Sequence, residues 1–404
     1  MTRTDTADVA VVGGGLVGLA TAWALARGDG RPRVVVLEAE ARVAAHQSGH
    51  NSGVLHSGLY YKPGSAKARL CRHGRARMLA FCAERGVPLT LSGKLVIATK
   101  DAERPLLHEL AERGAANGLQ GLELIPAERI RDLEPHAAGL EALSVPEAGV
   151  VDFPRAAAEL ARALGEEGGE VRTSARLTRV VRDAGELVVE TSAGALRCRV
   201  LVACAGLQAD RVARLSGVDP GVAIVPFRGD YFALRPERAA LVKALVYPVP
   251  DPRFPFLGVH FTRRVDGVVE AGPNAVVALA REAYGAYAVS ARDAFDVAAF
   301  PGLWRFVARH LPTAGAEVLR TLSRAAFARA ARRLVPEIRA EDLVRAGCGI
   351  RAQAMRRDGS LVEDFHVVEG AGMVHVLNAP SPAATASLAI GEEIAARARK
   401  HLAG

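Results

Sequence analysis

Cysteine, lysine and aromatic residues are all scarce in this chain of 404 residues. Its five cysteines form no Cys-x-x-Cys pair and no cluster with histidine at metal-ligand spacing, so we expect reduced thiols and no metal site. Lysine occurs six times against 46 arginines, and the formal net charge is +8. No clustered basic and aromatic motif accompanies this charge, so we expect no nucleic-acid partner.

The sequence also shows no targeting or membrane-spanning segment. No basic region followed by a cleavable apolar stretch is present, which favours a cytoplasmic protein. Residues 7–26 are apolar over a length that would span a bilayer, yet Gly13, Gly14 and Gly15 interrupt them where a strand would turn into a helix. Long polar or repetitive tracts are absent too, so we expect the chain to fold throughout, into two interlocked domains.

The N-terminal segment predicts a strand, helix and strand that bind a dinucleotide. The expected elements are a strand at 8–12, a helix at 16–27 and a strand at 33–38. Gly13, Gly15 and Gly18 form a G-x-G-x-x-G turn, whose missing side chains let the backbone approach a pyrophosphate in front of the helix. Glu38 ends the second strand, where its carboxylate can accept hydrogen bonds from the ribose hydroxyls.

This fingerprint does not separate FAD from NAD, but three further segments favour FAD. Residues 41–71 are dense in Gly, Ser, His and Tyr, which is typical of a loop around a ring and unlike the third strand of an NAD domain. Residues 185–210 predict a hairpin and a buried strand at 200–205 that ends at Gly206 beside the cofactor. Residues 346–398 predict strands, a turn and a last helix that could face the flavin.

With these segments the sequence resembles the D-amino-acid-oxidase-like superfamily of flavoproteins and, within it, the L-2-hydroxyglutarate oxidase/dehydrogenase family. The likeness runs nearly end to end, and its most specific stretches are 46–65, 225–232, 247–267, 272–276, 349–354 and 378–391. The resemblance implies an α/β fold, with a Rossmann-like FAD-binding domain of the glutathione-reductase-like, D-amino-acid-oxidase type and an antiparallel-sheet substrate domain. We expect the first at 1–75, 148–215 and 345–404, and the second at 76–147 and 216–344, with a helical insert at 283–338.

The residues expected to hold FAD follow from the glycine turn and the resemblance. They are Gly13, Gly15, Gly18, Glu38, His46, Ser48, His50, Asn51, Ser52, Gly53, Gly206, Pro380, Ser381, Ala383 and Ala384. His50 and Gly53 also resemble the H-x-x-G at which dimethylglycine-dehydrogenase-like relatives attach the flavin covalently. The alternative is a loop histidine that hydrogen-bonds to the cofactor or to backbone.

The implied activity is oxidation of a small 2-hydroxy acid, L-2-hydroxyglutarate in particular, by hydride transfer from C2 to flavin N5 while a base removes the hydroxyl proton. Arg351 is the expected catalytic and carboxylate-binding arginine, because it matches the superfamily's G-x-R element; the alternative is a surface strand arginine. Arg228 is the candidate for the distal carboxylate, unless it forms a structural ion pair with Asp230.

Two histidines are candidates for the base. His260 lies in a predicted substrate-domain strand and alternates with apolar neighbours, although a lone strand histidine is often a hydrogen-bonded core residue. His56 is its competitor, and Tyr60, Tyr61 and Lys62 follow closely enough to line the same wall of a substrate site. The choice between the two histidines stays open at this point.

The insert at 283–338 bears on the electron acceptor, which is oxygen or a quinone. It is helical in period, with Phe, Leu and Trp interleaved with arginines, so it is either an amphipathic cover or a peripheral contact with the inner face of a membrane. The rival functions are an FAD-dependent amine or amino-acid oxidase of the same superfamily and a non-enzymatic nucleic-acid-binding flavoprotein. A third alternative is an NAD dehydrogenase, which would be colourless. The oligomeric state stays open.

Overall fold

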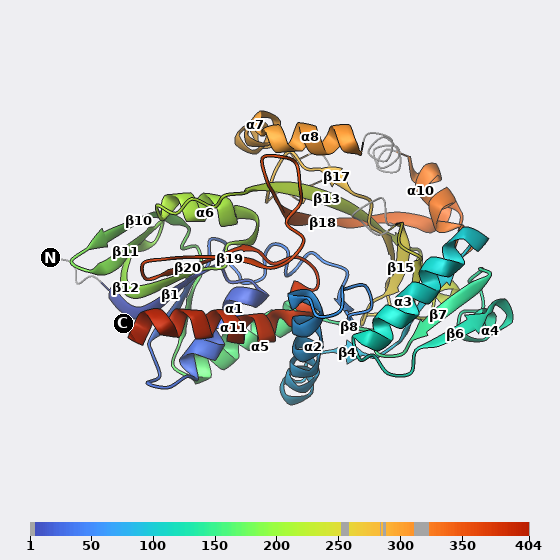
Figure 1. Cartoon of the computed structure of the whole chain (residues 1–404), viewed down its shortest axis with the longest axis horizontal. Coiled ribbons are helices and arrows are strands. Elements are labelled where there is room, and N and C mark those ends of the chain that lie inside the picture. The colour runs from blue at the N-terminus through green and yellow to red at the C-terminus, as the bar shows by residue number, and fades with distance from the viewer. Residues whose placement is uncertain (1–4, 252–257, 283, 286–287, 311–322, 404) are drawn as a thin grey trace.

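The fold is described from a computed structural model that covers residues 5–251, 258–282, 284–285, 288–310 and 323–403 (Figure 1). Two large sheets and one small sheet organise this part of the chain. In Figure 1 the first sheet, with both chain ends, lies at the left, and the far strands of the second lie at the right. Two long strands of the second sheet run across the top between these regions.

The first sheet is mostly parallel and has the order β10-β11-β12-β1-β2-β9, with β20 also paired to β12. Its strands are β1 (Asp5–Val12), β2 (Val34–Leu37), β9 (Glu170–Arg172), β10 (Leu177–Asp183), β11 (Glu186–Thr191), β12 (Gly194–Ala203), β19 (His366–Gly370) and β20 (Met373–Asn378). The helices around it are α1 (Leu16–Ala26), α2 (Ala66–Arg85), α5 (Phe153–Glu166), α6 (Ala209–Leu215) and α11 (Ala383–Ala403).

The predicted strand–helix–strand unit is confirmed, with ends that differ by at most three residues. Residues 9–12 of strand β1 are buried on both faces of the sheet, which explains why this half of the strand is apolar without a break. Val9 and Val11 pack in the cluster that α1, α5 and α11 form beneath the sheet, whereas Ala10 and Val12 pack against β10 and β11 on the other face. The buried strand predicted at 200–205 is the end of β12, which stops at Ala203.

The second sheet has the order β17-β13-β16-β15-β14-β5-β7-β6, with β18 paired to β13. Its strands are β5 (Lys94–Ala98), β6 (Glu123–Pro126), β7 (Glu141–Val145), β13 (Ala223–Leu234), β14 (Leu245–Pro248), β15 (His260–Arg263), β16 (Val269–Gly272), β17 (Val276–Val277) and β18 (Leu343–Met355). The expectation of an antiparallel sheet needs one correction, because β5 and β14 pair in parallel. These strands come from distant parts of the chain, so a hairpin does not impose their direction.

Helices pack on the faces of the second sheet, and a small sheet lies between the two regions. The helices are α3 (Arg104–Ala116), α4 (Ala127–Leu133), α7 (Ala291–Ala299), α8 (Pro301–Arg309) and α10 (Arg324–Ala331). The small sheet consists of β3 (Val54–Leu55), β8 (Gly149–Val151) and β4 (Leu89–Thr90). The domain boundaries stay a prediction, but the one at 345 falls inside β18, whose whole length from Leu343 to Met355 pairs with β13.

The predicted helical insert is a set of short helices, α7, α8 and α10, within the described part of 283–338. Residues 283, 286–287 and 311–322 of the insert lie outside the described residues, as do residues 252–257 of the family-specific stretch 247–267. In Figure 1, α7 and α8 lie at the top of the view, outside β13 and β18. Of the helices described, none combines the length and the apolar composition needed to cross a bilayer.

Candidate active site

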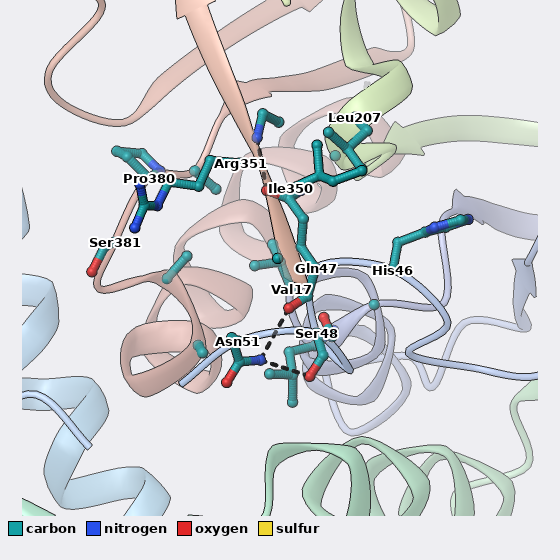
Figure 2. Close-up of a pocket in the computed structure, with 18 of the residues that line it drawn as sticks. Val17, His46, Gln47, Ser48, Asn51, Leu207, Ile350, Arg351, Pro380 and Ser381 are labelled. Atoms are coloured by element: carbon teal, nitrogen blue, oxygen red, sulfur yellow. Dashed lines mark hydrogen bonds between the residues drawn. The ribbon is translucent and has the colours of Figure 1, made fainter. Parts of the chain in front are cut away.

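A cavity of about 840 Å³ lies between the two large sheets. This volume is in the upper part of the range of roughly 300–1,000 Å³ that is typical of ligand sites. Its walls include the β1–α1 turn, residues 44–52, part of β18 and residues 379–384. In Figure 2, Arg351, Pro380 and Ser381 lie on one side of the cavity and His46 lies on the other. The wall also includes a group of aromatic and histidine side chains with one valine: His56, Tyr60, Tyr61, Tyr231, Tyr247, Val249 and His260.

The glycine turn shows why its three fingerprint positions lack side chains. A Cβ on Gly13 would lie 2.4 Å from the carbonyl oxygen of Cys204, and Gly13 has a φ of +109°. A Cβ on Gly18 would lie 2.0 Å from the carbonyl oxygen of Gly13, so Gly18 allows the helix to pack on the turn. At Gly15 the nearest atom is Ser48 Oγ at 3.1 Å, and Gly15 lines the cavity. The glycine turn therefore packs closely against backbone on one side and presents no side chain on the side that lines the cavity.

The start of α1 and the end of β2 fit the diphosphate and ribose of a dinucleotide. The first turn of α1 contains no acidic residue of its own, and the positive end of a helix favours a bound anion such as a diphosphate. Ser48 Oγ accepts a hydrogen bond from the Leu16 amide at 2.9 Å. The Glu38 carboxylate is 7% exposed and accepts from the amides of Gly14 at 2.6 Å and Glu40 at 2.8 Å, which fixes it at the wall.

The loop after β2 is held in shape by Asn51. Its side-chain amide donates to the carbonyl oxygens of Gln47 at 3.0 Å and Ser48 at 2.9 Å (Figure 2), and its side-chain oxygen accepts from the Gly53 amide. Gln47 joins this loop to β18, because its side-chain oxygen accepts from the Ala352 amide at 3.0 Å. A single loop therefore positions Ser48 at the start of α1 and supports the strand that carries Arg351.

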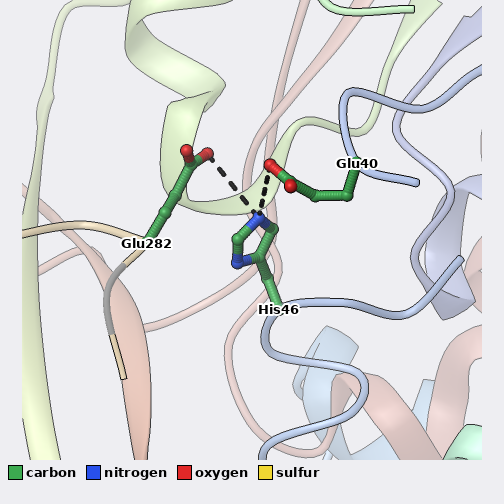
Figure 3. A group of neighbouring side chains, drawn as sticks. All are labelled: Glu40, His46 and Glu282. Carbon is green, nitrogen blue, oxygen red and sulfur yellow. Dashed lines mark hydrogen bonds and ion pairs between the residues drawn. The ribbon is translucent and has the colours of Figure 1, made fainter. Parts of the chain in front are cut away.

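The two loop histidines lie against a tyrosine and a charged cluster. The ring of His50 stacks on Tyr284 with a centroid separation of 3.8 Å, and His50 lines the cavity. Covalent attachment of the flavin at His50 stays a prediction. His46 Nε2 lies 3.4 Å from Glu40 and 3.9 Å from Glu282 (Figure 3), and Arg176 also pairs with both carboxylates. The arginine makes this cluster an ion network between the two halves of the fold.

Arg351 and two histidines, His260 and His56, also line the cavity. Arg351 is partly buried on β18 and lines the cavity. Burial, together with the charges of Lys94 and Arg351, lowers the pKa of His260 to about 3. Burial likewise lowers the pKa of His56 to about 3, with a contribution from Lys94. Both rings are therefore unprotonated near neutral pH, as a general base must be.

The tautomer of His260 follows from its hydrogen bond. Its Nδ1 lies 2.8 Å from the carbonyl oxygen of Gly258, which can only accept, so Nδ1 carries the proton and Nε2 keeps its lone pair. The ring stacks on Tyr247 at 4.0 Å, and this contact fixes its orientation. His56 differs, because its Nε2 already lies 3.3 Å from Ser381 Oγ.

Most of the predicted site residues line this one cavity, but four do not. Gly18 and Gly53 shape the turn and the loop from behind. Arg228 is a correction: its guanidinium pairs with Asp230 at 2.6 Å and donates to the Gly285 carbonyl, so the ion pair holds it outside the cavity wall. Lys62 is the second correction, because it is exposed and lies outside the wall that Tyr60 and Tyr61 form.

The structure adds residues that the sequence had not singled out. Gln47, Tyr231, Tyr247 and Arg113 line the cavity, and Lys94 lies buried against Tyr60 and Tyr247. Tyr231 and Tyr247 fall within the family-specific stretches 225–232 and 247–267, which was an available signal. Burial raises the pKa of Tyr231 to about 12, while the nearby charge of Arg351 opposes this increase, so the phenol stays protonated.

A parallel sheet with a glycine turn, facing a second sheet across one large cavity, defines a two-sheet, dinucleotide-dependent oxidoreductase. The family model described as FAD dependent oxidoreductase matches residues 8–397. The chain therefore belongs to the FAD-dependent oxidoreductase family, and FAD is its cofactor.

Relatives of similar length are found in bacteria and animals. An L-2-hydroxyglutarate dehydrogenase of Indibacter alkaliphilus is 44% identical over 95% of this chain and 96% of that protein. The mitochondrial L-2-hydroxyglutarate dehydrogenase of Homo sapiens is 43% identical over 97% of this chain and 88% of that protein.

Solved structures share the fold at lower identity. The dithionite-reduced L-alpha-glycerophosphate oxidase of Mycoplasma pneumoniae with FAD bound has a TM-score of 0.80 and 22% identity, over 99% of this chain and 96% of that one. A glycine oxidase of Geobacillus kaustophilus has a TM-score of 0.73 and 20% identity, over 98% of this chain and 95% of that one. These likenesses confirm the predicted fold class.

Proposed function

We propose that this protein oxidises L-2-hydroxyglutarate to 2-oxoglutarate, with FAD as the acceptor of the two electrons. The main support is the identity of 43–44% to L-2-hydroxyglutarate dehydrogenases over nearly the whole chain. The cavity supports the same reaction, because it combines a cofactor end at the glycine turn with an arginine and a neutral histidine at the other end. That pair suits an acid that must be anchored by a carboxylate and lose a hydroxyl proton.

The chain's own residues supply binding and proton transfer. Arg351 holds the C1 carboxylate of the substrate, because a guanidinium pairs with a carboxylate through two parallel hydrogen bonds. His260 takes the hydroxyl proton at Nε2, which its hydrogen bond to Gly258 leaves unprotonated. Tyr231, Tyr247 and His56 enclose the site and limit the access of water. FAD, when bound, supplies the acceptor for the hydride that leaves C2.

The direct test is reduction of the flavin by substrate. The purified holoprotein is mixed without oxygen with L-2-hydroxyglutarate, its D-isomer, lactate or sarcosine, and the flavin absorbance is recorded. We expect L-2-hydroxyglutarate to bleach the flavin at least about 100-fold faster than the D-isomer, because the wrong configuration cannot place its hydroxyl on His260 and its carboxylate on Arg351 together. Bleaching by sarcosine instead would contradict the proposal and favour an amine oxidase.

We further propose that α7 and α8 touch an anionic membrane, where a quinone accepts the electrons. Phe295 and Trp304 are 72% and 59% exposed on these adjacent helices, and Arg305 and Arg309 are exposed beside them. Exposed aromatic side chains next to arginines are typical of helices that lie in a membrane interface. The nearby Val289 is exposed as well and extends the apolar surface.

Sedimentation with vesicles of phosphatidylcholine and phosphatidylglycerol tests this contact. Replacing both Phe295 and Trp304 with serine should weaken vesicle binding at least about 100-fold, because each buried aromatic side chain contributes roughly 1.5–3 kcal/mol. The matched control replaces Leu124 and Leu133, which are 37% and 44% exposed, with serine. An equal loss in the control, or no binding by the original protein, would contradict the contact and leave oxygen as the acceptor.

A further inference from the structure

Lys94 is a buried cation that packs against Tyr60 and Tyr247, two tyrosines of the cavity wall. It is the first residue of β5, and it is only 3% exposed. Its ammonium lies 4.4 Å from the ring centroid of Tyr247 and 5.1 Å from that of Tyr60, and both rings line the cavity. Among the described residues no carboxylate pairs with it, and the only group that favours its charge through space is the thiol of Cys71.

Such a charge is costly to keep without an anion. Burial lowers the pKa of Lys94 to about 8, because a desolvated ammonium is less stable than one in water. Two aromatic faces compensate for only part of this cost. A carboxylate placed beside the ammonium would restore the full charge and gain a charge-assisted hydrogen bond. The arrangement thus has a cation in place and lacks its anion.

A second polar group at the same place also has no partner. The phenol oxygen of Tyr60 is buried, and no hydrogen-bond partner for it is found among the described residues. Buried hydroxyl groups nearly always make a hydrogen bond, so an isolated one facing a cavity points to a ligand. Tyr60 Oη and Lys94 Nζ together could hold the two oxygens of one carboxylate.

The positions of the other cations favour Lys94 for this role. Arg228, the sequence-based candidate for the distal carboxylate, is already paired with Asp230. The charges of Lys94 and Arg351 both act on His260, so the histidine lies within reach of the two cations. A dicarboxylic acid with its hydroxyl at His260 therefore has one carboxylate for Arg351 and a second for Lys94.

We propose that Lys94, with the Tyr60 hydroxyl, binds the distal carboxylate of the substrate and selects dicarboxylic over monocarboxylic 2-hydroxy acids. This inference rests on the proposed function. It assigns the chain-length and charge specificity to β5 and to the loop after β3, and it leaves the C1 carboxylate to Arg351. A site for monocarboxylic acids would need no cation at this place, because such substrates have no second carboxylate.

The first test compares two substrates in one variant. Replacing Lys94 with methionine, which keeps the length of the side chain, should raise KM for L-2-hydroxyglutarate about 100-fold, as loss of a buried ion pair does. For L-2-hydroxybutyrate, which lacks the distal carboxylate, KM should change less than about threefold. Lys94→Arg should recover part of the affinity for the dicarboxylic acid. Lys62→Met, a change at an exposed lysine outside the cavity, is the control.

The possible outcomes separate this inference from the proposed function. Suppose that L-2-hydroxyglutarate bleaches the original protein and that Lys94→Met still prefers L-2-hydroxyglutarate to L-2-hydroxybutyrate as strongly as the original protein does. The inference is then overturned and the proposed function stands. An original protein that L-2-hydroxyglutarate does not bleach overturns both. FAD content and thermal unfolding of each variant show whether it is folded.

A second test needs no variant and holds even if Lys94→Met fails to fold. At about pH 8.5 much of Lys94 is neutral, and glutarate, a substrate analogue without the hydroxyl, is fully ionised. Its binding should raise the pKa of Lys94, so titration calorimetry in two buffers of different ionisation enthalpy should show proton uptake. Butyrate, which offers Arg351 one carboxylate and Lys94 none, should show none.

The other titratable groups facing Lys94 do not produce this signal. His56 and His260 have pKa values of about 3. Cys71 has a pKa of about 12, and burial raises the pKa values of Tyr60 and Tyr247 far above the pH of the experiment. None of these groups takes up a proton near pH 8.5 even after a large shift. Binding of glutarate without proton uptake would overturn the inference.

Discussion

Replacing Arg351 with methionine is expected to lower kcat/KM for L-2-hydroxyglutarate about 10²- to 10³-fold, because removing one partner of a hydrogen-bonded charge pair costs roughly 2–5 kcal/mol. The loss should appear in kcat as well as in KM, since the guanidinium also orients C2 for the reaction. Anaerobic bleaching of the flavin over a range of substrate concentrations measures both parameters. The value of kcat/KM should fall by the same factor for monocarboxylic and dicarboxylic hydroxy acids, because both present a C1 carboxylate.

Two further substitutions make this expectation specific to Arg351. Arg351→Lys keeps the positive charge but lacks the planar guanidinium. We expect its kcat/KM to be only about tenfold higher than that of Arg351→Met. Arg228→Met removes an arginine from the neighbouring strand of the same sheet, and its pairing with Asp230 predicts reduced thermal stability with little change in KM. A larger kinetic loss at Arg228 than at Arg351 would contradict the assignment of the C1 carboxylate.

The strand–helix–strand unit at the N-terminus could be predicted because its signals are local. Residues 9–12 of strand β1 are apolar, the fingerprint glycines begin at the next residue, and Glu38 directly follows the next strand. Each feature depends on residues within one unit of about 30 positions. The pairing of β5 with β14 could not be predicted this way, because Lys94 and Leu245 meet only in the folded chain.

The candidate site was predictable in part, and its two corrections have different physical reasons. Arg228 and Asp230 are two positions apart on one strand, so both side chains leave the same face and pair locally. That spacing is visible in the sequence and favours the ion pair. Lys62 follows two tyrosines that do reach the cavity, but the chain turns outward at that point and leaves the lysine exposed.

Gln47 and Lys94 show the limit of sequence reasoning at this site. Gln47 acts through the Ala352 amide, which is 305 positions away in the chain. Lys94 begins an apolar strand, where a lysine ordinarily extends its ammonium into water. Only the folded structure shows that Tyr60 and Tyr247 close over it. Contacts of this kind depend on packing between distant segments and leave no periodic pattern.

Replacing His260 with alanine is expected to lower kcat about 10²- to 10⁴-fold, which is the usual contribution of a positioned general base. Its Nε2 is the free acceptor of a ring that Gly258 and Tyr247 hold in place. Because burial lowers the pKa of His260 to about 3, the original protein should show no loss of kcat/KM near the ordinary histidine pKa of about 6.5. A fall above about pH 8 is expected for the dicarboxylic substrate, as Lys94 loses its proton.

The same substitution at His56 distinguishes the two histidines. Its Nε2 already lies 3.3 Å from Ser381 Oγ, and its backbone amide donates to Thr385 Oγ1, so His56 joins the loop after β3 to the start of α11. We expect His56→Ala to lower kcat only about tenfold, through looser positioning of the site. Rates of anaerobic flavin bleaching at saturating substrate, with FAD content as the control, give this comparison directly. A greater loss at His56 than at His260 would make His56 the base, because only the group that takes the proton carries the full effect of general base catalysis.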